Sequence, residues 1–355
     1  MSNTLSLSYS YTNNTKTVGE LFKFDAPEDA PISSMLLPVR QYLLNGKPVN
    51  HPMVPVVDLD QIFTIEMIAD VIPYLVSRAG AVPFLFGPQG SGKTSSIRQF
   101  NARLNLPQSH LILGEDTEVR ELGQIMVPNE AGGMTKVPGA LYKAMQNGWV
   151  LHIDEYDLLP RRQQKLLNEV LENYTLSLDG MDANLKAHED FRVMISANTN
   201  NTGSMFGFTS EKGYDSSINE RFQFIRTHYL PEKQEIEFLE SYALAYFREK
   251  RAGIEESVLN VRMKAISKLI NFAVRDIATL IRKKNESDEE LTTTLSLRVL
   301  KEWILKTIIY QDFFQGFDGK EPIAMALERT YISGLLPDEQ SIVRQLFEDK
   351  FGKLF

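Results

Sequence analysis

FLFGPQGSGKTSS, residues 84–96, places a run of large apolar side chains directly before a loop of small ones. The apolar run begins at residue 81 as AVPFLF, which is typical of a short buried strand. Residues 97–104 follow the loop with apolar side chains at helical spacing. A strand, a glycine-rich loop and a helix in this order predict backbone that can approach a ligand closely.

The loop fits the pattern G-x-x-x-x-G-K-[ST] from Gly87 to Thr94, which is typical of a phosphate-binding loop. Glycines let backbone N–H groups surround phosphate oxygens, and the following helix adds the positive end of its dipole. Lys93 is expected between the β- and γ-phosphates, and Thr94 is expected to offer its hydroxyl to Mg²⁺. A glycine-rich turn without a ligand is the simpler alternative. The cofactors expected are ATP and Mg²⁺, and the expected binding residues are Gly87, Pro88, Gln89, Gly90, Ser91, Gly92, Lys93, Thr94 and Ser95.

A second polar cluster ends another apolar run, WVLHIDEYD at residues 149–157. Adjacent carboxylates at the end of a buried strand are costly unless a cation or a water molecule holds them there. We expect Asp154 to bind Mg²⁺, directly or through water, and Glu155 to act as the general base toward the attacking water. A polar strand end is the alternative. His152 is interpreted as a packing residue, and the histidines at 51, 110, 152, 188 and 228 are expected to form no metal-binding cluster.

Three further residues are candidates for catalysis. Asn198 follows the apolar run at 192–197, where its side chain can reach between the γ-phosphate and the water, although a turn residue is the alternative. Arg221 precedes the apolar run at 222–230, and Arg298 begins a helix beyond the strands. An arginine from outside the loop can neutralise charge that develops on the γ-phosphate. Structural ion pairing is the alternative for both arginines.

Short apolar runs recur along the chain with helical segments between them, at residues 81–86, 110–113, 149–153, 192–197 and 222–230. Strands that alternate with helices predict a mainly parallel sheet covered on both faces. Residues 125–139 and 174–191 fit neither pattern and are expected to form inserted hairpins. The predicted fold class is therefore α/β, with a five-stranded parallel sheet sandwiched by helices.

The strands stop after residue 230. Apolar residues at alternating steps of four and three predict a long helix over residues 259–280, and Val258, Val261, Leu269 and Val274 are expected to widen its buried stripe. A helix is also expected over residues 61–78, kinked or divided at Pro73. The parts expected are an N-terminal extension of residues 1–60, an α/β nucleotide-binding domain of residues 61–230, an all-helical lid of residues 231–312 and a C-terminal helical extension of residues 313–355.

The composition is that of an ordinary globular protein, with 355 residues, 43% hydrophobic residues and 24% charged residues. The absence of cysteine excludes disulfides and thiolate chemistry. No apolar run reaches the ~20 residues needed to cross a bilayer, so no membrane association is expected and the expected location is cytoplasmic. A net charge of −8 argues against a chain built to bind nucleic acid, although residues 243–284 are locally basic. A solvated helix face or a docking surface for an acidic partner explains that stretch.

The segments GPQGSGKT, LHIDEYD, ISANT, NERF and LSLR resemble, in this order, the motifs of AAA+ ATPases. The two expected hairpins are similar to the helix-2 and pre-sensor-1 insertions of the MoxR branch of that family. VGELFKFDAPEDAPI at residues 18–32 is similar to the N-terminal motif of the CobS-type ATPase subunit of the aerobic cobaltochelatase. The resemblance covers roughly residues 18–303. Residues 201–218 and 313–355 do not match the pattern and leave the substrate open.

The resemblance implies Asn198 as sensor one, Arg221 as the arginine finger and Arg298 as sensor two. It implies a ring, usually a hexamer, in which Arg221 reaches the nucleotide of the neighbouring subunit. ATP hydrolysis would remodel a protein partner that carries a von Willebrand A-type domain, and cobalt insertion into a corrin ring is one such use. A nucleic-acid-dependent motor or restriction-type NTPase is an alternative function, and a nucleotide-gated scaffold that barely hydrolyses ATP is another.

Overall fold

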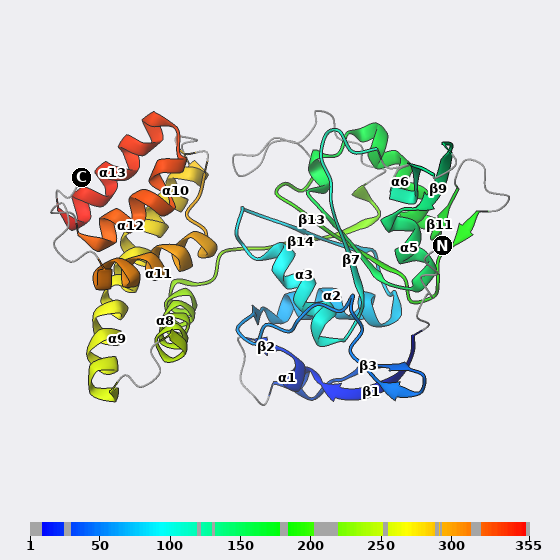
Figure 1. Cartoon of the computed structure of the whole chain (residues 1–355), viewed down its shortest axis with the longest axis horizontal. Helices are drawn as coiled ribbons and strands as arrows, with labels where there is room; N and C mark the ends of the chain where they lie inside the picture. The colour runs from blue at the N-terminus through cyan, green and yellow to red at the C-terminus, as the bar shows by residue number, and fades with distance from the viewer. Residues whose placement is uncertain are drawn as a thin grey trace. The chain divides into compact units, whose positions relative to one another are not determined.

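The computed structural model describes residues 9–24, 30–118, 122–129, 132–177, 184–201, 219–250, 255–287, 291, 293–313 and 321–352 (Figure 1). The chain divides into two compact units. The first unit comprises residues 1–87 and 92–227, and the second comprises residues 88–91 and 228–355.

The first unit is built on a five-stranded sheet with the order β14-β6-β13-β10-β7. All neighbouring strands in it run parallel, which confirms the predicted fold class. Every residue of β6 and β13 is buried, as expected for inner strands with helices on both faces. The strands are β6 (Val82–Phe86), β7 (Gln108–Ile112), β10 (Val150–Asp154), β13 (Arg192–Ala197) and β14 (Phe222–Arg226).

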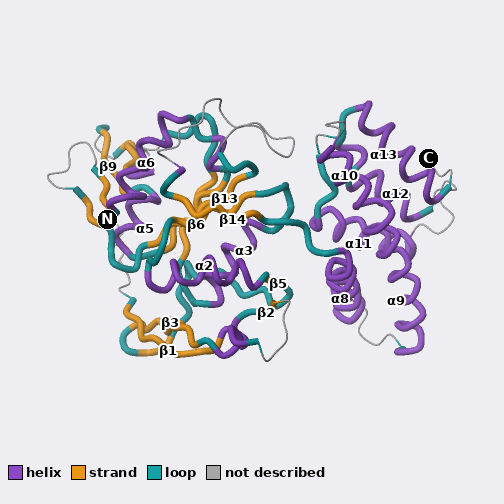
Figure 2. Tube along the Cα trace, turned by 180° about the vertical axis from the view of Figure 1, so that it is seen from behind, coloured by secondary structure: helices purple, strands orange, loops and turns teal. Residues whose placement is uncertain are grey.

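Helices cover both faces of this sheet, and Figure 2 shows the strands between the α2–α3 pair and α6. On one face α2 (Ile65–Ser77) and α3 (Lys93–Arg103) pack through residues such as Phe100 against Leu85 of β6. On the other face α5 (Ala140–Asn147) and α6 (Arg161–Asn173) pack against Ile153 of β10. Two separate apolar cores therefore hold the sheet from either side.

Both inserted hairpins are present as antiparallel strand pairs. The first joins β8 (Gln124–Pro128) to β9 (Met134–Pro138). The second pairs β11 (Thr175–Leu176) with β12 (Leu185–Lys186). Residues 178–183, which connect these two strands along the chain, lie outside the described residues.

The N-terminal segment, expected as an extension, forms strands and short helices. The strands β1 (Ser10–Thr17), β3 (Leu36–Leu44) and β4 (Lys47–Pro48) form a sheet. The short helix α1 (Val18–Leu21), the 3₁₀ turn η1 (Pro31–Ser34) and the pair β2 (Lys23–Phe24) with β5 (Ile62–Phe63) complete the segment. Val18 and Phe22 are buried in the same core as α2 and α3, because these large apolar side chains need cover that a loose extension does not provide.

The helix expected over residues 61–78 is shorter and unbroken. Residues 62–63 pair with β2, and the Thr64 hydroxyl then accepts a hydrogen bond from the backbone N–H of Met67, which starts α2. Pro73 lies inside this helix without dividing it.

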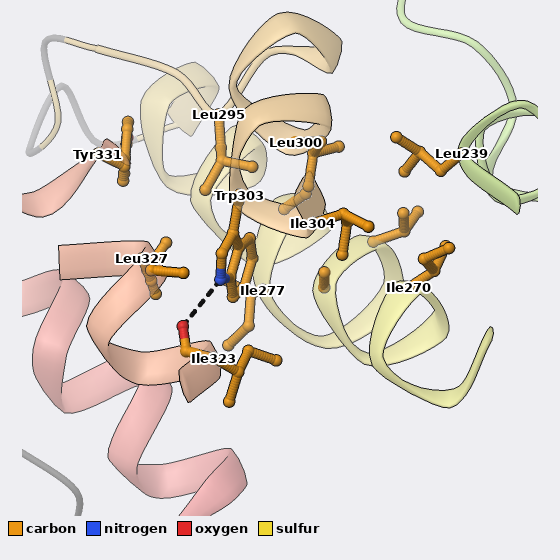
Figure 3. Close-up of a cluster of buried hydrophobic side chains, with 14 of the residues drawn as sticks. Leu239, Ile270, Ile277, Leu295, Leu300, Trp303, Ile304, Ile323, Leu327 and Tyr331 are labelled. Carbon is orange, nitrogen blue, oxygen red and sulfur yellow. Dashed lines mark hydrogen bonds between the residues drawn. The ribbon is translucent and has the colours of Figure 1, made fainter. Parts of the chain in front are cut away.

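The secondary structure elements described in the second unit are all helices. Its elements are α8 (Glu232–Lys250), α9 (Glu256–Asn271), the π-helix η3 (Phe272–Ala278), α10 (Thr279–Ser287), α11 (Leu297–Phe313), α12 (Pro322–Thr330), the 3₁₀ turn η4 (Ile332–Gly334) and α13 (Pro337–Phe351). Trp303 is fully buried at the centre of one apolar core, and its indole N–H donates to the carbonyl oxygen of Ile323 at 2.9 Å (Figure 3). That core also contains Phe347, so α12 and α13 pack with the preceding helices.

The predicted widening of the buried stripe of the long helix is confirmed for Val274 and Leu269, which pack in or against the core, and is wrong for Val258 and Val261. Their exposed fractions are 43% and 72%, because the first turns of α9 bury only the side that carries Leu259. Within the described ranges, no helix combines the length and apolar character that a membrane span requires.

Candidate active site

The glycine-rich loop has a backbone that side chains would obstruct. Gly87 has φ +152°, and a Cβ atom placed on it would lie 2.4 Å from the carbonyl oxygen of Thr227. Gly90 and Gly92 have φ of +77° and +85°, in the left-handed region that favours glycine, and Gly92 is the N-cap of α3. The loop tip, Pro88–Ser91, belongs to the second compact unit. Within that unit, the Tyr229 hydroxyl donates a hydrogen bond to the carbonyl oxygen of Gln89 at 3.1 Å.

Lys93 begins α3 and is 7% exposed. Its Nζ donates to the carbonyl oxygen of Gly87 at 2.9 Å and to Oδ1 of Asn198 at 3.2 Å. Burial lowers the pKa of Lys93 to about 8, and the nearby carboxylate of Asp154 opposes that shift. The loop, the helix and the end of β13 therefore meet at one buried ammonium group.

Asp154, the last residue of β10, lies beside Thr94 on α3. Its Oδ2 accepts from the Thr94 hydroxyl at 2.9 Å, and Nε2 of His110 lies 3.3 Å from the same oxygen. Its Oδ1 accepts from the Ser196 hydroxyl at 2.6 Å and from the backbone N–H of Glu155 at 3.1 Å. Burial acts to raise the pKa of Asp154, but the hydrogen bonds from His110, Ser196 and Thr94 hold it well below its usual range. The carboxylate is therefore ionised at neutral pH.

A chain of buried, hydrogen-bonded side chains leads to Ser196, whose hydroxyl donates to Asp154. The Asn101 amide donates to Oε1 of Gln108 at 3.0 Å, and Nε2 of Gln108 lies 3.2 Å from Nδ1 of His152. Nδ1 of His152 therefore accepts, and Nε2 carries the proton toward the Ser196 hydroxyl 2.7 Å away. Burial lowers the pKa of His152 to about 3, so its ring is neutral.

The expectation that the histidines form no cluster is wrong for His110 and His152. Ligand atoms of His110, His152 and Asp154 lie within 4.8 Å of one another. The parallel register of β7 and β10 places the two histidines side by side, although 42 residues separate them along the chain. Spacing along the sequence does not reveal such a pair. His152 is fully buried, as expected of a packing residue, but it also orients Ser196.

Glu155 has left-handed backbone, with φ +57°, directly after β10. Burial raises the pKa of its carboxyl group, and the charges of Asp154 and Asp157 raise it further. Asp157 is 1% exposed, and its Oδ2 accepts from the backbone N–H of Thr199 at 2.8 Å. This bond ties the acidic strand end to the segment that carries Asn198.

Ser95 and Arg221 bind other side chains, and Arg298 is exposed. The Ser95 side chain is turned toward Gln61 on the exposed side of α3. Arg221 precedes β14 and forms an ion pair with Glu172 of α6, with 2.9 Å between Nη2 and Oε2. Arg298 belongs to the second unit, where it is the exposed second residue of α11.

Sequence reasoning missed His110, Ser196 and Asp157. Asp157 belongs to the quoted segment IDEYD, and its apolar neighbours could have marked it as a buried carboxylate. Ser196 lies two residues before Asn198. Its side chain points to the opposite face of the sheet from those of its neighbours Ile195 and Ala197. His110 carries no such local signal.

Comparison with known proteins is consistent with this geometry. Residues 83–222 match the family model described as AAA domain (dynein-related subfamily). An uncharacterized protein of Staphylococcus haemolyticus is 23% identical over 274 residues, which cover 75% of this chain and 89% of that protein. Midasin of Giardia intestinalis is 29% identical over 119 residues, which cover 32% of this chain and 2% of Midasin.

Among solved structures, NtrX of Brucella abortus is similar with a TM-score of 0.41 and 18% identity. The similar region covers 77% of this chain and 59% of the NtrX chain. The parallel sheet, the glycine-rich loop after β6 and the family match over residues 83–222 agree with one another. Residues 83–222 are therefore similar to AAA domains, and the family model that they match is that of the dynein-related subfamily.

Proposed function

We propose that this protein is an ATPase that binds ATP with Mg²⁺ and hydrolyses it. The observation that carries the proposal is the set of hydrogen bonds that joins Lys93 to Asn198 and Thr94 to Asp154 at the end of the glycine-rich loop. A lysine, a hydroxyl, a carboxylate and an amide meeting at a helix N-terminus suit a triphosphate.

The oxygen donors fit Mg²⁺, which prefers carboxylate and hydroxyl ligands. Thr94 and Asp154 would hold the ion, and Asp154 is already ionised. When bound, Mg²⁺ neutralises charge that develops on the phosphates. Lys93 would hold the β- and γ-phosphates, Asn198 would orient the water, and Glu155, with its raised pKa, would take the proton from that water.

We further propose that the subunit works in a ring of the MoxR or CobS kind, usually a hexamer. Arg221 would leave Glu172 and reach the nucleotide of the neighbouring subunit, since its ion pair is partly solvated, with side chains 21% and 55% exposed. Hydrolysis would remodel a protein partner with a von Willebrand A-type domain. A chelatase complex that inserts cobalt, as substrate, into a corrin ring is one setting for that activity.

Phosphate release by the purified full chain tests the proposed ATPase. Lys93→Ala and Glu155→Gln should each abolish multiple turnover, while Glu155→Gln should still bind ATP. Lys143→Ala and Glu66→Gln remove exposed groups of the same kinds outside the site and should leave turnover unchanged. Unchanged phosphate release in Lys93→Ala or Glu155→Gln would overturn the proposal. Turnover that requires added nucleic acid would instead favour the nucleic-acid-dependent motor.

A further inference from the structure

His110 lies at the predicted cation site but has no role in the mechanism given above. It is the third residue of β7 and pairs in register with His152 of β10. The two rings are stacked, with centroids 4.5 Å apart and an interplanar angle of 13°. Stacking against a buried, hydrogen-bonded ring fixes the plane of the His110 imidazole, and its Nε2 lies 3.3 Å from Oδ2 of Asp154.

The two oxygens of Asp154 have different surroundings. Oδ1 accepts from the Ser196 hydroxyl and the Glu155 backbone, so protein donors occupy it. The orientation of the Ser196 proton is set by His152, whose Nε2–H points at the Ser196 oxygen. Oδ2 instead accepts from the Thr94 hydroxyl and lies near His110 Nε2, and both of these groups can themselves bind a cation, so Oδ2 is the oxygen that faces the predicted cation site.

In the structure His110 Nε2 and Asp154 Oδ2 are 3.3 Å apart, which is just beyond the usual length of an N–H···O hydrogen bond, about 2.7–3.2 Å. Two ligands at about 2.1 Å from one cation, at octahedral or tetrahedral angles, lie about 3.0–3.5 Å apart. The observed separation therefore fits two ligands of a shared ion. The His110 side chain is 37% exposed, so an ion arriving from solvent can reach it.

We propose that His110 Nε2 is a nitrogen ligand of the divalent cation that enters with the nucleotide, beside Thr94 and Asp154. His152 is the orienting residue behind them, because its nitrogens already bind Ser196 and Gln108. Imidazole favours first-row transition metals over Mg²⁺, so the site prefers an ion such as Mn²⁺ or Co²⁺ to Mg²⁺. This inference rests on the proposed nucleotide site and specifies its metal.

Pulsed electron paramagnetic resonance tests the ligand directly. The full chain, labelled with ¹⁵N-histidine only, is loaded with Mn²⁺ and a non-hydrolysable ATP analogue. A ¹⁵N hyperfine coupling to Mn²⁺ is expected, and only protein histidine can produce it. His110→Gln keeps a polar side chain beside Asp154 and should lose the coupling. His188→Asn is the matched control, because His188 also lies beside a carboxylate, 3.6 Å from Asp190, and should retain the coupling.

Competition between Mn²⁺ and Mg²⁺ gives a second readout. In His110→Gln the affinity for Mn²⁺ should fall more than the affinity for Mg²⁺, because an imidazole ligand is lost, so the preference for Mn²⁺ should fall about 10–100-fold. Mn²⁺ and nucleotide that bind without ¹⁵N coupling would overturn the role of His110 and leave the proposed ATPase intact. A coupling that survives in His110→Gln would also overturn it. Failure of the wild-type chain to bind any metal–nucleotide complex would overturn both proposals.

Discussion

Lys93 and Asn198 are joined by a hydrogen bond of 3.2 Å between Nζ and Oδ1, although 105 residues separate them. Lys93 comes from the start of α3, and Asn198 follows β13, the strand between β6 and β10. The amide holds the lysine charge in place together with the carbonyl oxygen of Gly87. Asn198 thus connects the expected phosphate-binding charge to the strand beside the acidic residues.

Replacing Asn198 with alanine should reduce turnover more than nucleotide affinity. A positioned polar group acts on the charge that develops during reaction, so the loss in kcat is expected to be about 10²-fold. Steady-state phosphate release and equilibrium ATP binding would separate the two effects. Asn147→Ala, at the end of α5, is the control and should behave as wild type. Loss of ATP binding with normal kcat at saturation would contradict the assignment.

Nucleotide affinity should fall as pH rises above about 8, because burial lowers the pKa of Lys93 to about 8. The anionic phosphates favour the protonated form of Lys93. Above about pH 8 the Lys93 ammonium of the free protein is partly deprotonated, so nucleotide binding must be accompanied by uptake of a proton. The affinity should then fall by up to about tenfold per pH unit. Calorimetry in buffers of different ionisation enthalpy would measure the proton uptake.

Lys93→Arg provides the contrast, because arginine stays protonated over this range. This variant should bind ATP more weakly but with a flat pH profile between about 7 and 9. The lowered pKa of Lys93 also affects the stability of the fold. The pKa of Lys93 is 10.5 in the unfolded chain, so its contribution to stability rises with pH between about 8 and that value. A wild-type affinity independent of pH would contradict the buried, shifted lysine.

The ion pair between Arg282 and Glu235 should stabilise the second unit only as a pair. Both guanidinium NH₂ groups bind the carboxylate, at 2.8 and 2.9 Å, and the side chains are 10% and 1% exposed. Arg282→Ala should lower the free energy of unfolding by about 3–5 kcal/mol, since it leaves a buried charge without its partner. Urea denaturation followed by tryptophan fluorescence in a Trp149→Phe background would report on this unit, because Trp303 is then the remaining tryptophan.

Replacing both partners, Arg282→Met with Glu235→Leu, should recover most of that loss because no buried charge remains. The exposed pair Lys233–Glu237, with side chains 86% and 62% exposed, is the control. Lys233→Ala should change the free energy of unfolding by less than about 1 kcal/mol. If the double variant were as unstable as Arg282→Ala, the cause would lie outside the ion pair, in the hydrogen bonds that the guanidinium donates to the carbonyl oxygen of Leu295 at 2.8 and 3.0 Å.

Gly87→Ala should destabilise the first unit by about 1–3 kcal/mol, because the added methyl group would lie against backbone that cannot move away easily. The carbonyl oxygen of Thr227 is 2.4 Å from that position, and the Thr227 N–H is itself bonded to Phe86 at 2.7 Å. Thermal unfolding would measure the loss. Gly114→Ala is the control, since nothing lies within 4 Å of its added methyl group. Equal unfolding temperatures for both variants would show that the loop tolerates the methyl group.

Arg221→Ala should retain ATP binding and lose turnover if Arg221 acts on the neighbouring subunit. Mixing it in equal amounts with Lys93→Ala should then restore about a quarter of wild-type activity, since half the sites keep Lys93 and half of those face an intact Arg221. Glu172→Gln distinguishes a catalytic role of Arg221 from a purely structural one. It breaks the ion pair but keeps Arg221, so turnover should persist in this variant. Two inactive variants that stay inactive when mixed would contradict action between subunits.

The fold of the first unit was predictable because its signals are local. Apolar runs of strand length alternate with helical periodicity, and parallel strands bring their carboxyl ends to one edge. That alone indicated that Lys93, Asp154 and Asn198 would lie close together, and the structure places them there. The packing of residues 18–22 on α2 and α3 was not predictable, because a short apolar segment does not specify what covers it.

The sequence by itself determined the glycine-rich loop, the acidic residues at the end of β10 and the order of strands and helices. Each of these features follows from the residue types and their spacing within a short segment. Only the tertiary structure decided that His110 stacks on His152 and that Ser196 and His152 orient Asp154. These contacts depend on the register of β7, β10 and β13, which long-range pairing sets and no single segment encodes.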